Sequence, residues 1–403
     1  MKKPSSKSAS LMLAAIFLIS LGLNRFFQAV LTDLHLREDI IVPLVLGLFL
    51  SSFPRMSTGK LKSTASWVFP LIGLFSVLVL LNAVFRNYNH KYDYINWLTR
   101  LSLYCGVPAM FLLSRPNFEE LDNRFNSLIN LIVLIAILLI TYRLFEYSLG
   151  FGISNLGPAR HKLSLVDPLR ISLGTGNNTI LDGRVVGFLV VTILLVVPWS
   201  LYQRLLLSII PILYLFMIGN RQSFAGIIGV VLLIVPFRHK VFAGSASAIV
   251  ALIAHTLDSW IGLGSRVLHG GDAGRFSIMA HYPSAIAEAS LFGYGYGAFT
   301  AQLSGGHYAH NVFIELVYEF GLLAFFCSAF LLILFAVSFV RRRRVVQDTT
   351  LGSYLTVGVL YYLIVAQFSG TLYDNLQVFA FLIAYMSFFA GSVETVFSRR
   401  NQI

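Results

Sequence analysis

The hydrophobic positions of this chain gather in long runs and do not alternate with polar ones. A helix needs roughly 20 predominantly apolar residues to cross the hydrocarbon core of a bilayer, and by that measure the chain has about twelve membrane-spanning helices. The predicted spans are 10–31, 38–54, 66–85, 95–114, 127–148, 184–200, 203–219, 222–237, 240–262, 310–340, 350–371 and 374–396. The expected fold is an all-α polytopic membrane protein in which residues 1–403 form a single integral membrane domain.

The polar segments between these runs predict which side of the membrane each one faces. With the N-terminus in the cytoplasm, the cytoplasmic segments hold 17 of the 30 Lys and Arg residues, including the run Arg341–Arg344. Basic residues in short loops stay on the cytoplasmic side of a membrane. We therefore predict that both termini are cytoplasmic. Two longer loops, 149–183 and 263–309, then lie outside as periplasmic loops, the second with short helices.

Composition agrees with a membrane protein. The chain is 57% hydrophobic and 12% charged, with a mean hydropathy of +0.76, whereas a soluble domain carries about 25% charged residues. A net charge of +12 would suggest nucleic acid in a soluble protein, but here cytoplasmic loops account for much of it and no nucleic-acid partner is expected. Cys105 and Cys327 fall inside apolar runs and are interpreted as small buried hydrophobes.

Several basic residues are predicted to lie on the external side, against the usual bias. An anionic ligand bound at the outer leaflet would explain them, because the guanidinium group offers a planar fork of donors to phosphate oxygens. These residues belong to the two external loops or to adjacent span ends: Arg160, Lys162, Arg170, Arg184, Arg221, Arg266 and Arg275.

Two of these arginines have suggestive surroundings. Arg221 lies in "MIGNRQSFAGIIG", at a tight external turn between two spans; the alternative is an arginine that extends along the membrane surface toward water. Arg275 lies in "GGDAGRFSIMAHYP", where apolar spacing predicts a loop helix over 276–291 with Asp272 as its cap. A helix N-terminus favours phosphate, although Arg275 could equally be a solvated loop charge.

Polar residues also cluster in "GGHYAHNVFIELVYEFG", residues 305–321, at the external end of the tenth span. His310 could serve as a general base, because a neutral imidazole can accept a proton near pH 7. Carboxylates inside a span, such as Glu315 and Glu319, are costly and usually functional. Glu315 could orient the imidazole, although a spacing of five does not place it on the same helical face. The alternative for His310 is amphipathic packing at the membrane surface.

Two other patterns are not interpreted as ligand sites. "GYGYGAF", residues 293–299, lacks the Lys-Ser/Thr and the strand–helix context of a phosphate loop, and we expect a tight, close-packed turn that returns the loop to the membrane. His281, His307 and His310 match no standard zinc spacing. No metal and no cofactor are predicted.

Together these residues give the chain a family likeness. An external arginine after a helix break (Arg221), a "GR" arginine in the large external loop (Arg275), the "GYGYG" return and "HNVFIELVYEFG" resemble the O-antigen ligase/polymerase superfamily. The family motif is His, then Asn, Ser or Gln, then nine residues and Gly, which His310, Asn311 and Gly321 fit. Ala324 stands where the family often has Gly, Thr or Tyr. The resemblance covers about residues 180–325 by motif and the rest by predicted topology.

The resemblance implies an inverting, metal-independent glycosyltransferase of the bacterial inner membrane with a periplasmic active site. Its donor would be an undecaprenyl-pyrophosphate-linked glycan. Arg221, Arg275 and Arg184 would bind the pyrophosphate and stabilise its developing charge, and His310 would deprotonate the acceptor hydroxyl. Supporting candidates are Asn311, Glu315, Arg160 and Lys162.

The sequence favours a polymerase, in which the acceptor is a second lipid-linked glycan, because the loop 263–309 is compact. The alternative is a ligase that transfers the glycan to lipid A core. A second alternative is a transporter or flippase of lipid-linked glycans, although no internal repeat is visible. Expected partners are membrane lipids, the lipid-linked oligosaccharide, the acceptor glycan or lipid A core, and a chain-length regulator as a further candidate.

Overall fold

The computed structural model describes residues 11–26 in part, and 118–150, 179–218, 220–234, 278–304, 309–347, 349–368 and 375–400. Every regular element in these ranges is a helix, which confirms the all-α class for the described part of the chain. The predicted spans 38–54, 66–85, 95–114 and 240–262 lie outside the described residues.

The chain divides into two compact units. Unit 1 contains Met1–Leu21, Pro43–Phe125 and Gly274–Ile403, and unit 2 contains Gly22–Val42 and Asn126–Ala273. Helix α6 (Phe118–Gly150) begins in the sequence of unit 1 and ends in that of unit 2. The single membrane domain expected for residues 1–403 stays a prediction.

Helix α6 is longer than the hydropathy pattern indicated. It has 33 residues and begins at Phe118, nine residues before the predicted span 127–148. Its first turn carries Glu119 and Glu120, and acidic side chains stabilise a helix N-terminus through the exposed backbone N–H groups. A polar sequence therefore forms helix here although it contributes nothing to an apolar run.

The sixth span was predicted at 184–200, and this is wrong by five residues. The corresponding helix α7 is Thr179–Leu195. Pro198 follows it, and proline ends helices because it lacks an N–H group and restricts the preceding residue. Arg184 consequently lies in the second turn of α7 and not at the end of a span.

Helices α8 (Leu201–Ile218) and α9 (Arg221–Ile234) confirm the predicted elements 203–219 and 222–237 to within a few residues. The start of α8 is capped reciprocally. Ser200 N donates to Gln203 Oε1 at 3.0 Å, and Gln203 N donates to Ser200 Oγ at 3.4 Å, which satisfies backbone donors that the first turn leaves open. Helix α7 packs against both α8 and α9, and from position 182 to 193 all its side chains are buried.

Unit 1 contains α15 (Gly321–Gln347), α16 (Thr350–Val365) and α17 (Leu376–Arg400). Thr349 Oγ1 accepts a hydrogen bond from Gly352 N and caps α16. Asp122 of α6 accepts one from Leu351 N at 2.7 Å. Helices α16 and α17 approach closely at Gly358, where a Cβ would overlap the ring of Phe381.

Two stretches of described helix, Phe118–Phe145 and Val312–Val340, are long and apolar enough to cross a membrane. Both carry large apolar side chains that are exposed at helical spacing. On α15 the exposed positions recur every three or four residues, which defines one stripe along the helix. We call this set the α15 stripe: Phe326, Phe330, Ile333, Val337 and Val340. A soluble surface rarely exposes such a contiguous apolar stripe.

Candidate active site

The predicted span 310–340 is correct in extent but is not one straight helix. It consists of α14 (Val312–Glu315), the π-helix η5 (Leu316–Phe320) and α15. Gly321 joins η5 to α15 with φ 89° and ψ 171°, a backbone conformation that is essentially restricted to glycine. The helix axis therefore breaks at Gly321.

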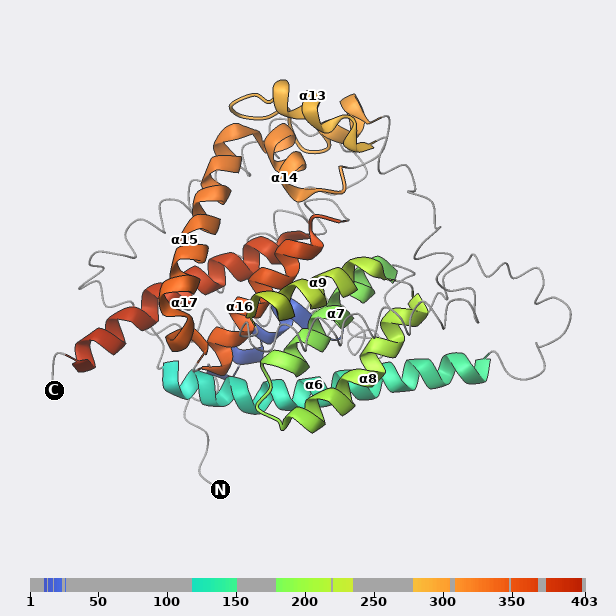
Figure 1. The fold of residues 1–403 in the computed structure, drawn as a ribbon, viewed down its shortest axis with the longest axis vertical. Helices are drawn as coiled ribbons and strands as arrows, with labels where there is room; N and C mark the ends of the chain where they lie inside the picture. Colours follow the sequence, from blue (N-terminus) through green and yellow to red (C-terminus); the bar gives the residue numbers. More distant parts are fainter. Residues whose placement is uncertain are drawn as a thin grey trace, which may run out of the picture. The chain divides into compact units, whose positions relative to one another are not determined.

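The break folds α14 back beside α15. The rings of Phe313 and Phe325 lie 6.4 Å apart, edge to face. In a straight helix these residues would be separated by about 18 Å along the axis, because each residue rises about 1.5 Å. Residues 312–320 and the first turns of α15 thus form a short helical hairpin (Figure 1).

A loop segment supplies the hydrogen bonds that this break requires. Tyr294 N donates to Tyr318 O at 3.0 Å, and Gly295 N donates to Glu319 O at 2.9 Å. On the far side of the break, Leu322 N and Leu323 N donate to carbonyl oxygens of the same loop segment. Backbone polar groups are paired in this way when they are shielded from water.

The glycines of "GYGYGAF" make that approach feasible. Gly293, Gly295 and Gly297 all have positive φ, at 75°, 109° and 80°. A Cβ on Gly293 would overlap the carbonyl of Glu319, and one on Gly321 would overlap the amide of Gly293. The prediction of a tight, close-packed turn is confirmed.

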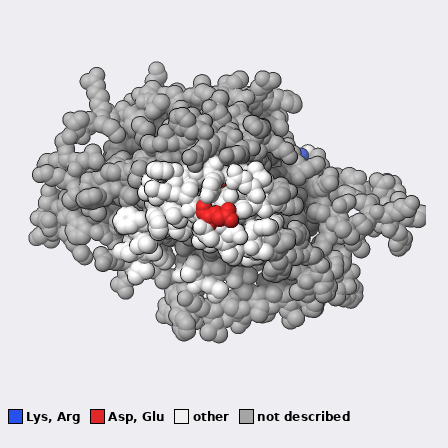
Figure 2. All heavy atoms as spheres, turned by 90° about the horizontal axis from the view of Figure 1, so that it is seen from above, with Lys and Arg blue, Asp and Glu red and all other residues white. Residues whose placement is uncertain are grey.

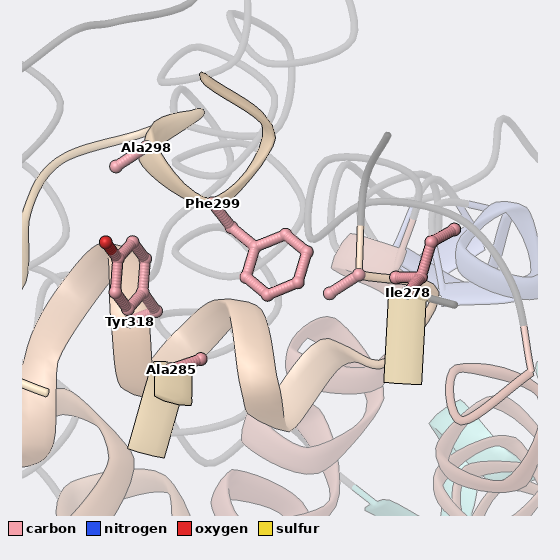
Figure 3. Packing of buried hydrophobic residues seen from close by; sticks show 6 residues of the cluster. Ile278, Ala285, Ala298, Phe299 and Tyr318 are labelled. Carbon is pink, nitrogen blue, oxygen red and sulfur yellow. The ribbon is translucent and has the colours of Figure 1, made fainter. Parts of the chain in front are cut away.

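Residues 278–304 and 309–320 pack around a small apolar core, and we call them the cap. Figure 3 shows the ring of Phe299 pointing into the centre of this core, with Tyr318 on one side and Ile278 on the other. The Tyr282 hydroxyl donates to the carbonyl oxygen of Ala309, directly before His310. The loop helix α13 (Tyr282–Ala287) is shorter than the helix predicted over 276–291.

Glu319 connects the two halves of the cap. Its side chain is 3% exposed, and a carboxylate oxygen accepts a hydrogen bond from Phe299 N at 3.3 Å. Its neighbour Tyr318 donates from the hydroxyl to Gln302 Oε1 at 3.0 Å. The buried carboxylate therefore has a clear structural role, which is to hold the loop against the hairpin.

His310 adopts a backbone conformation that is uncommon for residues with a Cβ. Its φ is 56°, in the left-handed region, which costs a residue with a Cβ about 1–2 kcal/mol relative to the right-handed one. Backbone strain of this kind persists only where the surroundings enforce it, and such residues cluster at functional sites. The side chain of His310 is half-buried, and it lies at the open end of the hairpin, opposite the break at Gly321.

The next residue, Asn311, is held in place by hydrogen bonds from two elements. Its Oδ1 caps α14 by accepting hydrogen bonds from Phe313 N at 3.0 Å and Ile314 N at 3.2 Å. Its Nδ2 donates to Gln367 Oε1 at 3.1 Å. The adjacent Val312 N donates to Ala366 O at 3.3 Å. Both ends of Asn311 are thereby used, one for its own helix and one for the end of α16.

These observations give the His-Asn-x9-Gly spacing a physical basis. His310 takes the left-handed turn, Asn311 caps, the four residues of α14 and five of η5 form the helix, and Gly321 breaks it. Glu315 is 2% exposed within α14, and its predicted role toward His310 stays a prediction. Gln367 was not identified from the sequence. Its polarity at the end of the apolar helix α16 was the available signal.

In unit 2, Arg184 in α7 and Arg221 in α9 lie in the sequence next to residues that join these two helices. Asn220 caps α9, because its Oδ1 accepts from Ser223 N at 3.1 Å, and Arg221 is the first residue of that helix. The Ser223 hydroxyl donates to Gly183 O at 2.7 Å, next to Arg184 in α7. Arg184 itself is 1% exposed.

The remaining predicted site residues are not placed. Arg275, Arg160 and Lys162 lie outside the described residues, as does Asp272. Cys327 is a buried free cysteine, as expected, and Cys105 is not described. Among the side chains that the structure describes, no cluster of His, Cys, Asp and Glu could hold a metal ion.

Comparisons with protein-family models, with curated proteins and with solved structures found no match.

Proposed function

We propose that this chain is a surface-polysaccharide polymerase of a bacterial inner membrane. It would transfer a glycan from an undecaprenyl-pyrophosphate donor to a hydroxyl of a second lipid-linked glycan on the periplasmic side. The observation that carries the proposal is the fixed, left-handed His310 at the open end of the hairpin, because strain maintained by two neighbouring elements is typical of a functional residue.

In the proposed reaction His310 is the general base. The imidazole accepts the proton of the acceptor hydroxyl as that oxygen attacks the anomeric carbon of the donor sugar. The bond between the anomeric carbon and the diphosphate oxygen breaks, and undecaprenyl pyrophosphate leaves with the electron pair. Attack from the face opposite the leaving group inverts the anomeric centre.

The pyrophosphate is assigned to Arg221, Arg275 and Arg184. Guanidinium groups bind phosphate oxygens in a bidentate manner, and their charge would stabilise the leaving diphosphate without a metal ion. The first residue of α9 is Arg221, and a helix N-terminus adds backbone donors and a partial positive charge. Arg160 and Lys162 are assigned weaker, supporting contacts with the same anion.

The topology belongs to the same proposal. About twelve spans, cytoplasmic termini and external loops at 149–183 and 263–309 would place His310 on the periplasmic side. The two apolar stretches Phe118–Phe145 and Val312–Val340, with their exposed apolar side chains, support insertion in a membrane.

The test is a gel of surface glycans from a strain that lacks the gene and is complemented with variants. His310→Ala and Arg275→Ala should abolish the long ladder and leave a single repeat unit on the lipid core. His281→Ala is the matched control, because His281 lies in the same cap at the start of α13, and it should restore the ladder. Immunoblots of the membrane fraction should show equal amounts of each variant.

Other patterns would replace the proposal. A lipid core without attached glycan, together with accumulation of polymer on the undecaprenyl carrier, would identify a ligase. A normal ladder with both His310→Ala and Arg275→Ala would remove the catalytic assignment and leave transport of the lipid-linked glycan as the better explanation.

A further inference from the structure

We propose that one face of the cap lies in the interfacial layer of the outer leaflet, against lipid. This cap face consists of Met279, Pro283, Ile286, Ala287, Leu291 and Phe292, all of which are exposed. The inference rests on the proposed insertion of α15 in the membrane. It does not depend on the glycosyltransferase chemistry.

The composition of the cap is unlike that of a loop surrounded by water. Residues 278–304 are 27 in number, and Glu288 is the only Asp, Glu, Lys or Arg among them. A segment of average soluble composition would contain about seven. Figure 2, which looks at the molecule from above, shows acidic atoms surrounded by uncharged ones.

Helix α13 divides the exposed residues into an apolar edge and a polar edge. At 3.6 residues per turn, Pro283, Ile286 and Ala287 fall within an arc of about 100°, and Ser284 and Glu288 follow beyond it. Ala285 is fully buried on the opposite side, in the core of the cap. Such a division is typical of elements that lie in the membrane–water interface.

Backbone hydrogen bonds connect the loop that carries the cap face to the first turn of α15, one turn before the α15 stripe begins at Phe326. Leu322 N donates to Ser290 O at 3.0 Å, and Leu323 N donates to Leu291 O at 3.2 Å. Leu291 and Phe292, each more than half exposed, are thereby fixed beside the first turn of α15. Figure 1 shows the cap at this end of α15.

The connection between the cap face and α15 indicates that lipid covers this face. From 321 to 340, α15 has 20 residues without an ionised side chain, a length of about 30 Å that matches the hydrocarbon core. The cap face then lies at the depth where α15 leaves the hydrocarbon. Because the α15 stripe meets lipid tails, the apolar side chains that extend it at this end meet the interfacial layer of the same leaflet.

Site-directed spin labelling of the full chain in vesicles of phosphatidylethanolamine and phosphatidylglycerol tests whether the cap face contacts lipid. Nitroxide labels are attached to Ile286→Cys and Phe292→Cys in a Cys105→Ala, Cys327→Ala background. Ser284→Cys, on the polar edge of the same helix, is the water-facing control, and Phe330→Cys, in the α15 stripe, is the lipid-facing control. Collision rates are measured with oxygen, which concentrates in lipid, and with a water-soluble nickel chelate.

Lipid seating predicts a nickel collision rate several-fold lower at 286 and 292 than at 284, together with high oxygen accessibility. If 286 and 292 are as accessible to nickel as 284 while 330 is protected, the cap face is in water and the inference is wrong. If 286 and 292 are shielded from both reagents, a protein covers the face, which also overturns it. If 330 itself is accessible to nickel, insertion of α15 and the seating both fail.

Discussion

The side-chain amide nitrogen of Asn311 donates a hydrogen bond of 3.1 Å to Gln367 Oε1, across 56 positions of sequence. Gln367 in turn donates from Nε2 to Leu363 O at 3.1 Å. This chain of contacts connects the residue after His310 to the last turn of α16. The position of the candidate base therefore depends on a helix that contributes no chemistry of its own.

Gln367→Ala should slow glycan transfer by about tenfold, which corresponds to about 1.4 kcal/mol of transition-state stabilisation. The reason is that Asn311 would no longer be held at the end of α16, and His310 would be less well positioned. The KM for the acceptor should change less than kcat, because the residue touches no substrate in this scheme. Steady-state kinetics of the purified chain with lipid-linked repeat units measure both.

Two further variants show whether the hydrogen bond is responsible. Gln367→Glu keeps an oxygen that accepts from Asn311 and should retain most activity. In a double-mutant cycle, Asn311→Ala should add little to Gln367→Ala in kcat beyond the loss of the helix cap, because the two residues act together. Full additivity of the two kcat effects would show that they act separately.

His310→Gly should separate activity from stability. Loss of a general base lowers the rate by about 10²–10⁴-fold. Glycine adopts φ 56° without the penalty of a Cβ, so His310→Gly should be more stable than His310→Ala by about 1 kcal/mol. Thermal unfolding in detergent micelles compares the two variants. An alanine variant that equals or exceeds the glycine variant in stability would contradict the strained backbone. Added imidazole should partly restore transfer by His310→Gly and have no effect on Arg275→Ala.

Gly321→Ala should destabilise the protein by roughly 3 kcal/mol or more, because alanine at φ 89° and ψ 171° is strained and its Cβ would also overlap the Gly293 backbone. We expect little folded protein in the membrane fraction and a much lower Tm. Gly293→Ala, on the other side of the same contact, should behave similarly. A wild-type Tm for either variant would mean that the helix does not break as described.

Gly183→Ala tests the contact between α7 and α9. Its Cβ would overlap the Asn220 side chain, so the cap of α9 should be displaced at a cost of about 1 kcal/mol. Under the proposed function, Arg221 at the start of α9 moves with that cap, and the KM for the lipid-linked donor should rise. A shift in Tm without a change in KM would show that the Asn220 cap of α9 stabilises the fold but does not affect donor binding.

Local sequence patterns were sufficient where one short-range effect dominated. The apolar runs located α8 and α9 to within a few residues and the start of α16 at Thr350, although α16 ends six residues before its predicted span. Every side chain in a run favours burial or lipid independently of its partners. The glycines of 293–297 identified a tight turn for a similar reason, since positive φ is a local property of glycine. Pro198 also marks the end of α7, because proline ends helices, whereas the apolar run continues past it.

The helical class, the apolar stretches long enough to cross a membrane, and the order of His310, Asn311 and Gly321 could all be predicted from the residues alone. Whether these residues form a hairpin or the start of a straight helix depends on contacts between distant segments. The hairpin requires donors from 294 and 295 to pair with the carbonyls of 318 and 319, and the end of α16 to accept a hydrogen bond from Asn311. A helix that is shielded from water can break only where other groups replace the hydrogen bonds it loses. Here those groups come from distant segments, which no local pattern specifies.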